Sequence, residues 1–312
     1  MSQTPLTDSL LLTRWGLYIL ILRASEQQKG FRKPIFVFKV RRIPHVDQIR
    51  ISQLRSRVSL VVCVIDALTS QAPLGNTTTV HLEGTRSKAI RKSNGSYIFN
   101  DLSPGEYRLS VHSEYYFQEQ TNITVNAHNF IEVVQMKPLP SYPFSQGAGL
   151  IRFMLQNAAG SPIRNAHLQS TVLTEDCARA RVMVDQADKG ANEMTLGSFT
   201  GGIVVGDVYL LRGRGSQPAE EVIHISEVLE HQKRFRLANP LTKSYSRGAM
   251  LLPIQETRST ERGEVVIAFR GNRIPTFHTE LVITYGTDSE HTIKDLAVVE
   301  GTTTNLGTIH LA

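Results

Sequence analysis

Residues Ser93–Leu109, SNGSYIFNDLSPGEYRL, decide the fold class of this chain. Ser93-Asn94-Gly95 predicts a hairpin turn, because Asn-Gly tolerates the positive φ that a tight hairpin needs. Tyr97 and Phe99 then alternate along the following strand, and Ser103-Pro104-Gly105 marks the next turn. The stretch therefore predicts short consecutive strands joined by tight turns, as in an antiparallel β-sheet.

The same pattern continues on both sides of this stretch. Val58–Ile65 is a short apolar run, residues 78–83 alternate between apolar and polar, and Ile131–Met136 forms a last strand-like segment. With the strands around the hairpin these give about seven strands in roughly 80 residues, the spacing of a small antiparallel sandwich. We assign residues 58–138 to this first β-sandwich.

The second half of the chain repeats this order of segments. Glu261–Phe269 resembles Asn94–Phe99, Glu280–Gly286 resembles Glu106–His112, and Thr302–Leu311 resembles Asn126–Met136. We infer an internal repeat, with a second sandwich over residues 149–312. Residues 139–148, rich in proline and glycine, are predicted to be the linker between the two sandwiches.

The second sandwich is interrupted by residues 172–256, a stretch too long and too regularly patterned for a loop. Gly201–Gly213, Glu220–Leu229 and Lys233–Leu241 each have the alternation or the glycine punctuation of strands. This stretch predicts a small inserted domain, either a β-barrel or a β-ribbon.

The net charge of +6 is distributed unevenly. Residues 1–57 contain 11 Lys and Arg against 3 Asp and Glu, whereas the remaining 255 residues contain 23 against 25. Within this basic arm, Phe31–His45 mixes aromatic and basic residues, and Pro34 and Pro44 bracket it as they would an edge strand. Such a strand can pair with a neighbouring subunit or bind nucleic acid, and a solvated polar face is the third interpretation.

We favour a protein partner for the arm, because the rest of the sequence contains no nucleic-acid-binding module. The candidate contact residues are its basic side chains: Lys29, Arg32, Lys33, Lys39, Arg41, Arg42 and Arg50.

No catalytic, cofactor or metal motif stands out in the sequence. Two cysteines exclude a disulfide scaffold and a four-thiolate zinc site. His224, Glu227, Glu230 and His231 lie close together, but the surrounding alternation favours a strand, on which His224 and Glu227 face opposite ways. We therefore predict a protein that is not an enzyme, with no catalytic residue, no cofactor and no metal site.

The N-terminal apolar run does not have the form of a targeting or membrane segment. Arg14 splits Ser9–Leu22, and a spanning helix needs about 20 apolar residues. We expect no membrane-spanning segment and a chain that stays in the cytoplasm unless it leaves as part of an assembly.

Residues 60–138 resemble the carboxypeptidase regulatory-like family, a transthyretin-like β-sandwich. The resemblance rests on Val64–Asp66, on the hairpin Asn94–Phe99, and on Asp101–Tyr107, which has the family's order of leucine, x, proline, glycine, x, tyrosine. It implies a non-catalytic accessory module. The expected fold is all-β: two transthyretin- or Ig-like antiparallel sandwiches, the second interrupted by a small barrel-like insertion, and a basic N-terminal β arm.

The insertion resembles a pattern of phage-tail and injection-system proteins. The segments that carry this resemblance are Val205-Gly206-Asp207-Val208-Tyr209, Glu221–Ile225, Pro240-Leu241 and Arg247–Ala249. With the transthyretin-like repeats, it implies an accessory subunit of a contractile, phage-tail-like injection system, such as a cap or cap adaptor.

We therefore expect a structural subunit at the cap or terminator end of such a particle. It would dock onto tube, sheath or cap proteins, form a homo-oligomeric ring, and be assembled in the cytoplasm into a particle that is later released or anchored. The alternative is a surface or fibre-like module that recognises carbohydrate or a host protein, and an accessory protein of an enzyme is a third hypothesis.

Overall fold

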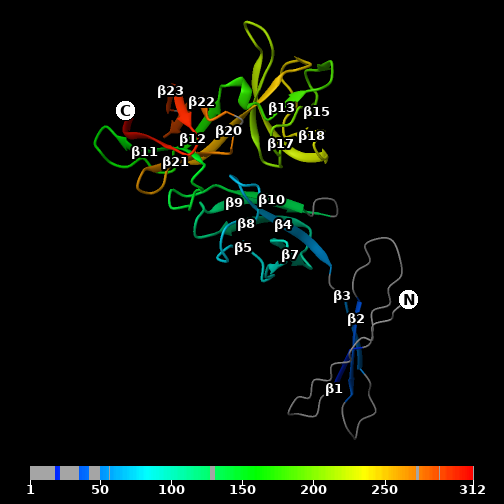
Figure 1. The fold of residues 1–312 in the computed structure, drawn as a ribbon. Coiled ribbons are helices and arrows are strands. Elements are labelled where there is room, and N and C mark those ends of the chain that lie inside the picture. Colours follow the sequence, from blue (N-terminus) through cyan, green and yellow to red (C-terminus); the bar gives the residue numbers. More distant parts are fainter. Residues whose placement is uncertain are drawn as a thin grey trace.

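The computed structural model describes residues 18–21, 35–41, 50–55, 57–126, 131–271, 274–287 and 289–311. Within these ranges, every regular element is a β-strand except the short 3-10 helix η1 (Glu175–Cys177). The predicted all-β fold class is confirmed. Figure 1 shows the strands grouped into a small N-terminal sheet, drawn in blue, and three larger units.

The first unit is a sandwich of two sheets, with strand orders β10-β4-β7-β6 and β5-β8-β9. Alternation along β4 turns Leu60, Val62 and Val64 into the core, where they meet Phe99 and Leu109. Its strands are β4 (Val58–Asp66), β5 (Thr79–Leu82), β6 (Ile90–Arg91), β7 (Ser96–Asn100), β8 (Gly105–His112), β9 (Glu119–Val125) and β10 (Ile131–Met136).

The second unit repeats this topology. Its strands are β11 (Gly149–Asn157), β12 (His167–Val172), β21 (Glu264–Phe269), β22 (Thr276–Tyr285), β23 (Ser289–Val299) and β24 (Thr303–Leu311). β11 is antiparallel to β21 and parallel to β24, just as β4 is antiparallel to β7 and parallel to β10. The order β12-β22-β23 likewise matches β5-β8-β9, so the internal repeat is confirmed.

The third unit is the insertion, which has a core of its own around Leu211, Phe235 and Tyr245. Its strands are β13 (Ala180–Val182), β14 (Gln186–Ala187), β15 (Glu193–Gly197), β16 (Val208–Arg212), β17 (Glu220–Glu230), β18 (Arg234–Leu237), β19 (Tyr245–Ser246) and β20 (Met250–Arg258). The sheet β13-β15-β18-β17-β16-β20 curls back on itself through a short pairing of β13 with β20. This curl makes the insertion barrel-like.

β20 belongs to both the insertion and the second sandwich. Its residues 250–254 pair with β16, and its residues 254–258 pair with β12. One nine-stranded sheet therefore runs from the insertion into the second sandwich. The predicted end of the insertion, at residue 256, falls inside this shared strand.

The N-terminal sheet has the order β1-β2-β3, with both pairings antiparallel. Its strands are β1 (Tyr18–Ile21), β2 (Ile35–Arg41) and β3 (Arg50–Arg55). The expectation that the basic segment forms an edge strand is wrong for β2, which has a neighbour on each side. Pro34 and Pro44, on which that expectation rested, lie outside the described residues.

The Pro/Gly segment at 139–148 packs on the first sandwich. Tyr142 is buried in that core, and its hydroxyl donates to Asp66 Oδ2 at 2.6 Å. Tyr116 donates to the same oxygen at 2.9 Å, and the two rings meet edge to face at 5.5 Å. Burial, followed by the nearby Asp66 carboxylate, raises the pKa of the Tyr142 phenol, so Tyr142 remains a donor. The segment therefore fixes where the second sandwich begins.

Candidate functional site

The predicted contact residues of the arm fall into two groups. Lys29, Arg32, Lys33 and Arg42 lie outside the described residues. Lys39, Arg41 and Arg50 lie on described strands: Lys39 stands opposite Leu20 and Ile51, Arg41 opposite Tyr18, and Arg50 opposite Val40. All three positions are therefore in the paired part of the N-terminal sheet, and their role as contacts remains a prediction.

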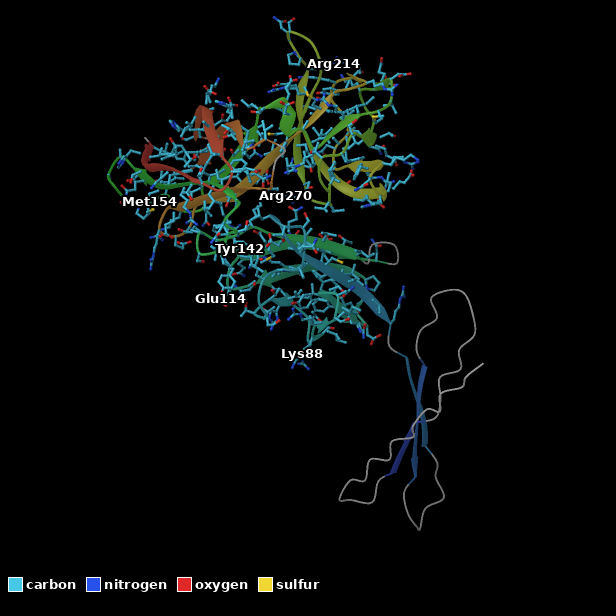
Figure 2. The ribbon with its side chains drawn as sticks, in the orientation of Figure 1. Lys88, Glu114, Tyr142, Met154, Arg214 and Arg270 are labelled. Atoms are coloured by element: carbon cyan, nitrogen blue, oxygen red, sulfur yellow. The ribbon has the colours of Figure 1, made fainter. Side chains whose placement is uncertain are left out.

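The most densely bonded polar cluster that joins different units is centred on Arg270, at the junction of all three (Figure 2). Arg270 directly follows β21 of the second sandwich. Its Nη2 and Nη1 atoms bind both carboxylate oxygens of Asp207, at 2.9 and 3.2 Å, and Asp207 directly precedes β16 of the insertion. Its Nε and Nη2 atoms also donate to the carbonyl of Ala67, which follows β4 of the first sandwich, at 3.1 and 2.6 Å. One side chain thus connects three units.

The Asp207 carboxylate is buried and saturated with donors. In addition to the hydrogen bonds from Arg270, this carboxylate accepts one from the Tyr209 hydroxyl at 2.9 Å and one from the Val204 backbone N–H at 3.0 Å. Burial, followed by the Asp207 charge, raises the pKa of the Tyr209 phenol well above its usual value, which keeps this phenol a donor. A bidentate, charge-assisted pair of this kind fixes geometry as well as energy.

The turn before Asp207 contacts the first sandwich through its backbone. Gln135 on β10 donates from Nε2 to the Val205 carbonyl at 2.9 Å and to Asp207 Oδ1 at 3.3 Å. Gly206 has a φ of +89°, and a Cβ atom there would lie 2.9 Å from Gln135 Cδ. Both the positive φ and the close approach favour glycine at this position. The Val-Gly-Asp motif of the sequence is therefore an element of the interdomain junction.

A second arginine closes the cluster from the insertion side. Arg179 is 6% exposed and donates to the carbonyls of Gly271 and Arg270 at 3.1 and 3.2 Å. Burial lowers the pKa of its guanidinium, and the nearby Arg270 charge acts in the same direction. The space left between these side chains is a cavity of about 40 Å³, enough for about one water molecule.

Contacts beside this cluster extend the junction. Lys137, which directly follows β10, has its Nζ atom 3.2 Å from Glu256 Oε2 on β20, and Gln169 donates to the other oxygen of Glu256 at 2.7 Å. Burial alone would raise the pKa of Glu256, but Lys137, Gln169 and His167 together outweigh burial and lower it. The carboxylate form is therefore the one that the junction stabilises.

Two more arginines of the second sandwich dock on the first. Arg258 donates to the Gln118 carbonyl and stacks over Phe117, with its guanidinium carbon 4.9 Å from the ring centroid. Arg152 donates to the Pro140 carbonyl at 3.2 Å and lies 5.6 Å from the Phe144 centroid. Such cation–π contacts add to the stability of an interface. Together, the contacts of the junction hold the two sandwiches and the insertion in one relative orientation.

The histidine and glutamate cluster weighed in the sequence lies on and just after β17. Glu227 pairs with Arg236, and Glu230 with Lys233, so both carboxylates already have a cationic partner. Among the described residues, no group of three or more His, Cys, Asp or Glu is placed to hold a metal ion. The described part of the chain also contains no helix that is long and apolar enough to cross a membrane.

Sequence reasoning identified one side of this junction and missed the other. The Val205–Tyr209 motif stood out as a pattern, but its partners Arg270, Gln135 and Ala67 did not. Arg270 is 63 residues from Asp207, and no periodicity connects the two positions. The repeat gives the strand pairing within each sandwich and not the packing of one unit on another, so it does not identify these partners either.

A family model for the β-sandwich domain of ER membrane protein complex subunit 7 matches residues 69–158, which is under a third of the chain. The match supports a β-sandwich in the first unit. A search of curated protein sequences finds no significant match.

Several solved structures are similar at low identity. The Bacillus anthracis TIE protein is 8% identical with a TM-score of 0.23, over 89% of this chain and 57% of that protein's. A DUF3823 family protein from Bacteroides ovatus is 11% identical with a TM-score of 0.20, over 77% of this chain and 97% of its own. BcpA, the major pilin subunit of Bacillus cereus, is 10% identical with a TM-score of 0.23, over 78% and 69%. TM-scores this low support no functional comparison.

Proposed function

We propose that this protein is a non-enzymatic structural subunit of a contractile, phage-tail-like injection particle, positioned at its cap or terminator end. In this proposal the basic N-terminal sheet docks onto tube, sheath or cap proteins. The two sandwiches and the insertion form a brace of fixed geometry. Assembly takes place in the cytoplasm, and the subunits form a ring.

The observation that carries this proposal is the Arg270 junction. Arg270 pairs with Asp207 while donating to Ala67, and the exposed fractions of the Arg270 and Asp207 side chains are 16% and 6%. A buried bidentate pair shared by three units resists rotation of any one unit against the others. A structural subunit of an assembly needs domains of fixed relative orientation, whereas a mobile binding domain would be joined by a flexible linker.

The family match supports the coarser part of the proposal. The matching domain is named for a subunit of a membrane protein complex, so a related sandwich occurs within a multi-subunit assembly. The resemblance of Val205–Tyr209 and the other insertion segments to phage-tail proteins supports the finer part.

The test is a charge reversal of the arm in the source organism. The variant K39E/R41E/R42E should be absent from purified sheathed particles, because like charges repel an acidic docking surface. The matched control K189E/R214E/R262E reverses three exposed cations of the insertion and second sandwich and should be incorporated normally. Particles that form normally and never contain the wild-type protein would contradict the proposal.

A second candidate function, a carbohydrate-binding module, is favoured by one feature. A groove of about 540 Å³ lies on the outer face of β11, β21 and β24, and its polar lining residues include Arg152, Glu264, Asn305 and Thr308. The register of β11 and β24 is irregular beside it, and such irregularities often occur next to binding sites. Binding to a glycan array that is lost in R152A/N305A would favour this candidate over the structural one.

A further inference from the structure

The first sandwich has an apolar outer face on its sheet β10-β4-β7-β6. Cross-strand pairing aligns Ile131, Val61, Ile98 and Ile90 in one row across all four strands. The residues on either side of Val61 and Ile98 turn into the core, so the row faces outward. Ile131 is 59% exposed and Ile90 is 47% exposed. A solvated sheet face normally carries polar residues at such positions.

This face is continuous with the interdomain junction. The next outward row is Val133, Cys63 and Ser96, and the row after it contains Gln135 and Ile65. Gln135 is already covered by the turn at Val205–Asp207. The insertion therefore covers one end of the apolar face, and the Ile131–Ile90 row at the other end remains exposed.

The free edge of the same sheet is strongly basic. β6 is the edge strand, and residues 85–100 contain four cations and no acidic residue. Arg86, Lys88, Arg91 and Lys92 are all exposed, and none has an ion-pair partner among the described residues. Figure 2 shows Lys88 at the end of the first sandwich that is remote from Arg270. Four unpaired cations therefore flank the apolar row.

We propose that this edge and face form a docking surface for an acidic, extended segment of a partner protein, which adds as a strand beside β6. The partner's main chain would pair with the open side of β6, its carboxylates would meet Arg86, Lys88, Arg91 and Lys92, and its apolar side chains would cover Ile90 and Ile98. The proposal goes beyond the structural role above and does not depend on the particle being an injection system.

The chemistry of this surface favours a protein strand over nucleic acid or lipid. Single-stranded nucleic acid sites stack bases on aromatic side chains, but the outward row here is aliphatic. Interfacial lipid binding uses an amphipathic helix with apolar side chains that insert, whereas this row lies flat on a sheet. An open sheet edge offers main-chain donors and acceptors with which an added strand can pair.

The test uses a defined peptide with the full-length protein. The probe is a fluorescent, terminally blocked (Glu-Val)4 peptide, and (Lys-Val)4 is its control. We expect (Glu-Val)4 to bind at 50 mM salt, with at least tenfold weaker binding at 500 mM salt, because exposed charges are screened.

Two variants locate the site. R86E/K88E/R91E/K92E should lose binding at least tenfold, and I90S/I98S should lose it while keeping all four cations. K189E/R214E/R262E/K294E, which reverses the same number of exposed cations on the other units, should bind like the wild type. Unchanged melting temperatures would show that each variant is folded.

Three outcomes would overturn the proposal. The first is the absence of (Glu-Val)4 binding at 50 mM salt. The second is equal loss of binding in the matched control. The third is that R86E/K88E/R91E/K92E abolishes binding to phosphatidylserine vesicles or to single-stranded DNA while (Glu-Val)4 binds no better than (Lys-Val)4, which would assign the surface to lipid or nucleic acid.

Discussion

At the scale of single residues, the contact between the three units depends on the hydrogen bonds of one guanidinium, that of Arg270. Four of the five N–H groups of Arg270 donate hydrogen bonds: two to the carboxylate oxygens of Asp207 and two to the single carbonyl oxygen of Ala67. Replacing either ionic partner leaves a buried charge without its counterion, and that penalty exceeds the value of the pair itself. The junction is therefore sensitive to single substitutions.

We predict that R270M destabilises the protein by about 3–5 kcal/mol, since it leaves the buried Asp207 carboxylate without a counterion. The measurement is the free energy of unfolding in urea. The control R164M removes an exposed pair with Glu261, whose side chains are 64% and 71% exposed, and should cost about 0–1 kcal/mol. Equal losses in the two variants would contradict the assigned role of Arg270.

Glu256 gives the junction a pH dependence. The pKa of folded Glu256 lies below its usual value of 4.5, so the unfolded state takes up the proton first as the pH falls. The contribution of the Glu256 carboxylate to the free energy of unfolding is therefore complete above a pH of about 4.5. It is lost as the pH falls through the pKa of Glu256 in the folded protein. E256Q should therefore be less stable than the wild type at pH 7, by about 1–3 kcal/mol, and the difference should shrink towards pH 3.

Urea unfolding of the wild type and E256Q across this pH range checks the prediction. E261Q is the control, because Glu261 is exposed and should show no such trend. A difference between the wild type and E256Q that does not change with pH would mean that the charge of Glu256 contributes nothing.

At the scale of elements, the shared strand β20 sets where the chain can be cut. Thr171 pairs with Ile254, so residues 172 and 253 face each other across the start of the β12–β20 ladder. A two-residue Asn-Gly turn can close that gap. We predict that replacing residues 173–252 with Asn-Gly leaves two sandwiches that melt cooperatively.

The wider excision, residues 172–256 replaced by a short Gly/Ser linker, should fail. It removes most of β20 and with it the strand that pairs with β12. Differential scanning calorimetry distinguishes the two variants. If both keep a cooperative transition, β20 is not part of the second sandwich core.

The elements that sequence reasoning predicted well are those with local signals. Asn94-Gly95 forms the expected hairpin: Gly95 has a φ of +82°, and the Asn94 side chain accepts from the Ser96 backbone N–H. The edge-strand prediction for the basic arm failed because β2 pairs with both β1 and β3, and these long-range pairings leave no local signal in the segment. The four cations at 86–92, on and beside β6, were missed because charge was counted over long segments, in which the acidic residues elsewhere in the first sandwich offset them.

At the scale of the whole molecule, each of the three larger units has its own core, and the N-terminal sheet pairs only within itself among the described strands. The arm should therefore be removable. The cut belongs before Arg57, because two hydrogen bonds anchor the start of β4 there. The Asp101 N–H donates to the Arg57 carbonyl, and the Arg57 N–H donates to Asp101 Oδ1.

We predict that deleting residues 1–56 leaves a soluble protein with the wild-type melting temperature, and that the truncated protein is no longer incorporated into particles. Circular dichroism and particle purification measure the two effects. Unfolding of the truncated protein would place the arm in the core of the first sandwich.

The central claim is that the Arg270 junction holds the first sandwich and the insertion in one fixed orientation. The most direct measurement is the distance distribution between two spin labels, one at E106C on β8 and one at K189C in the insertion. Pulsed electron–electron double resonance measures it in a C63S background, in which the remaining Cys177 is buried. We predict one narrow distribution, which R270M broadens. A broad distribution in the protein with Arg270 intact, unchanged by R270M, would contradict the account.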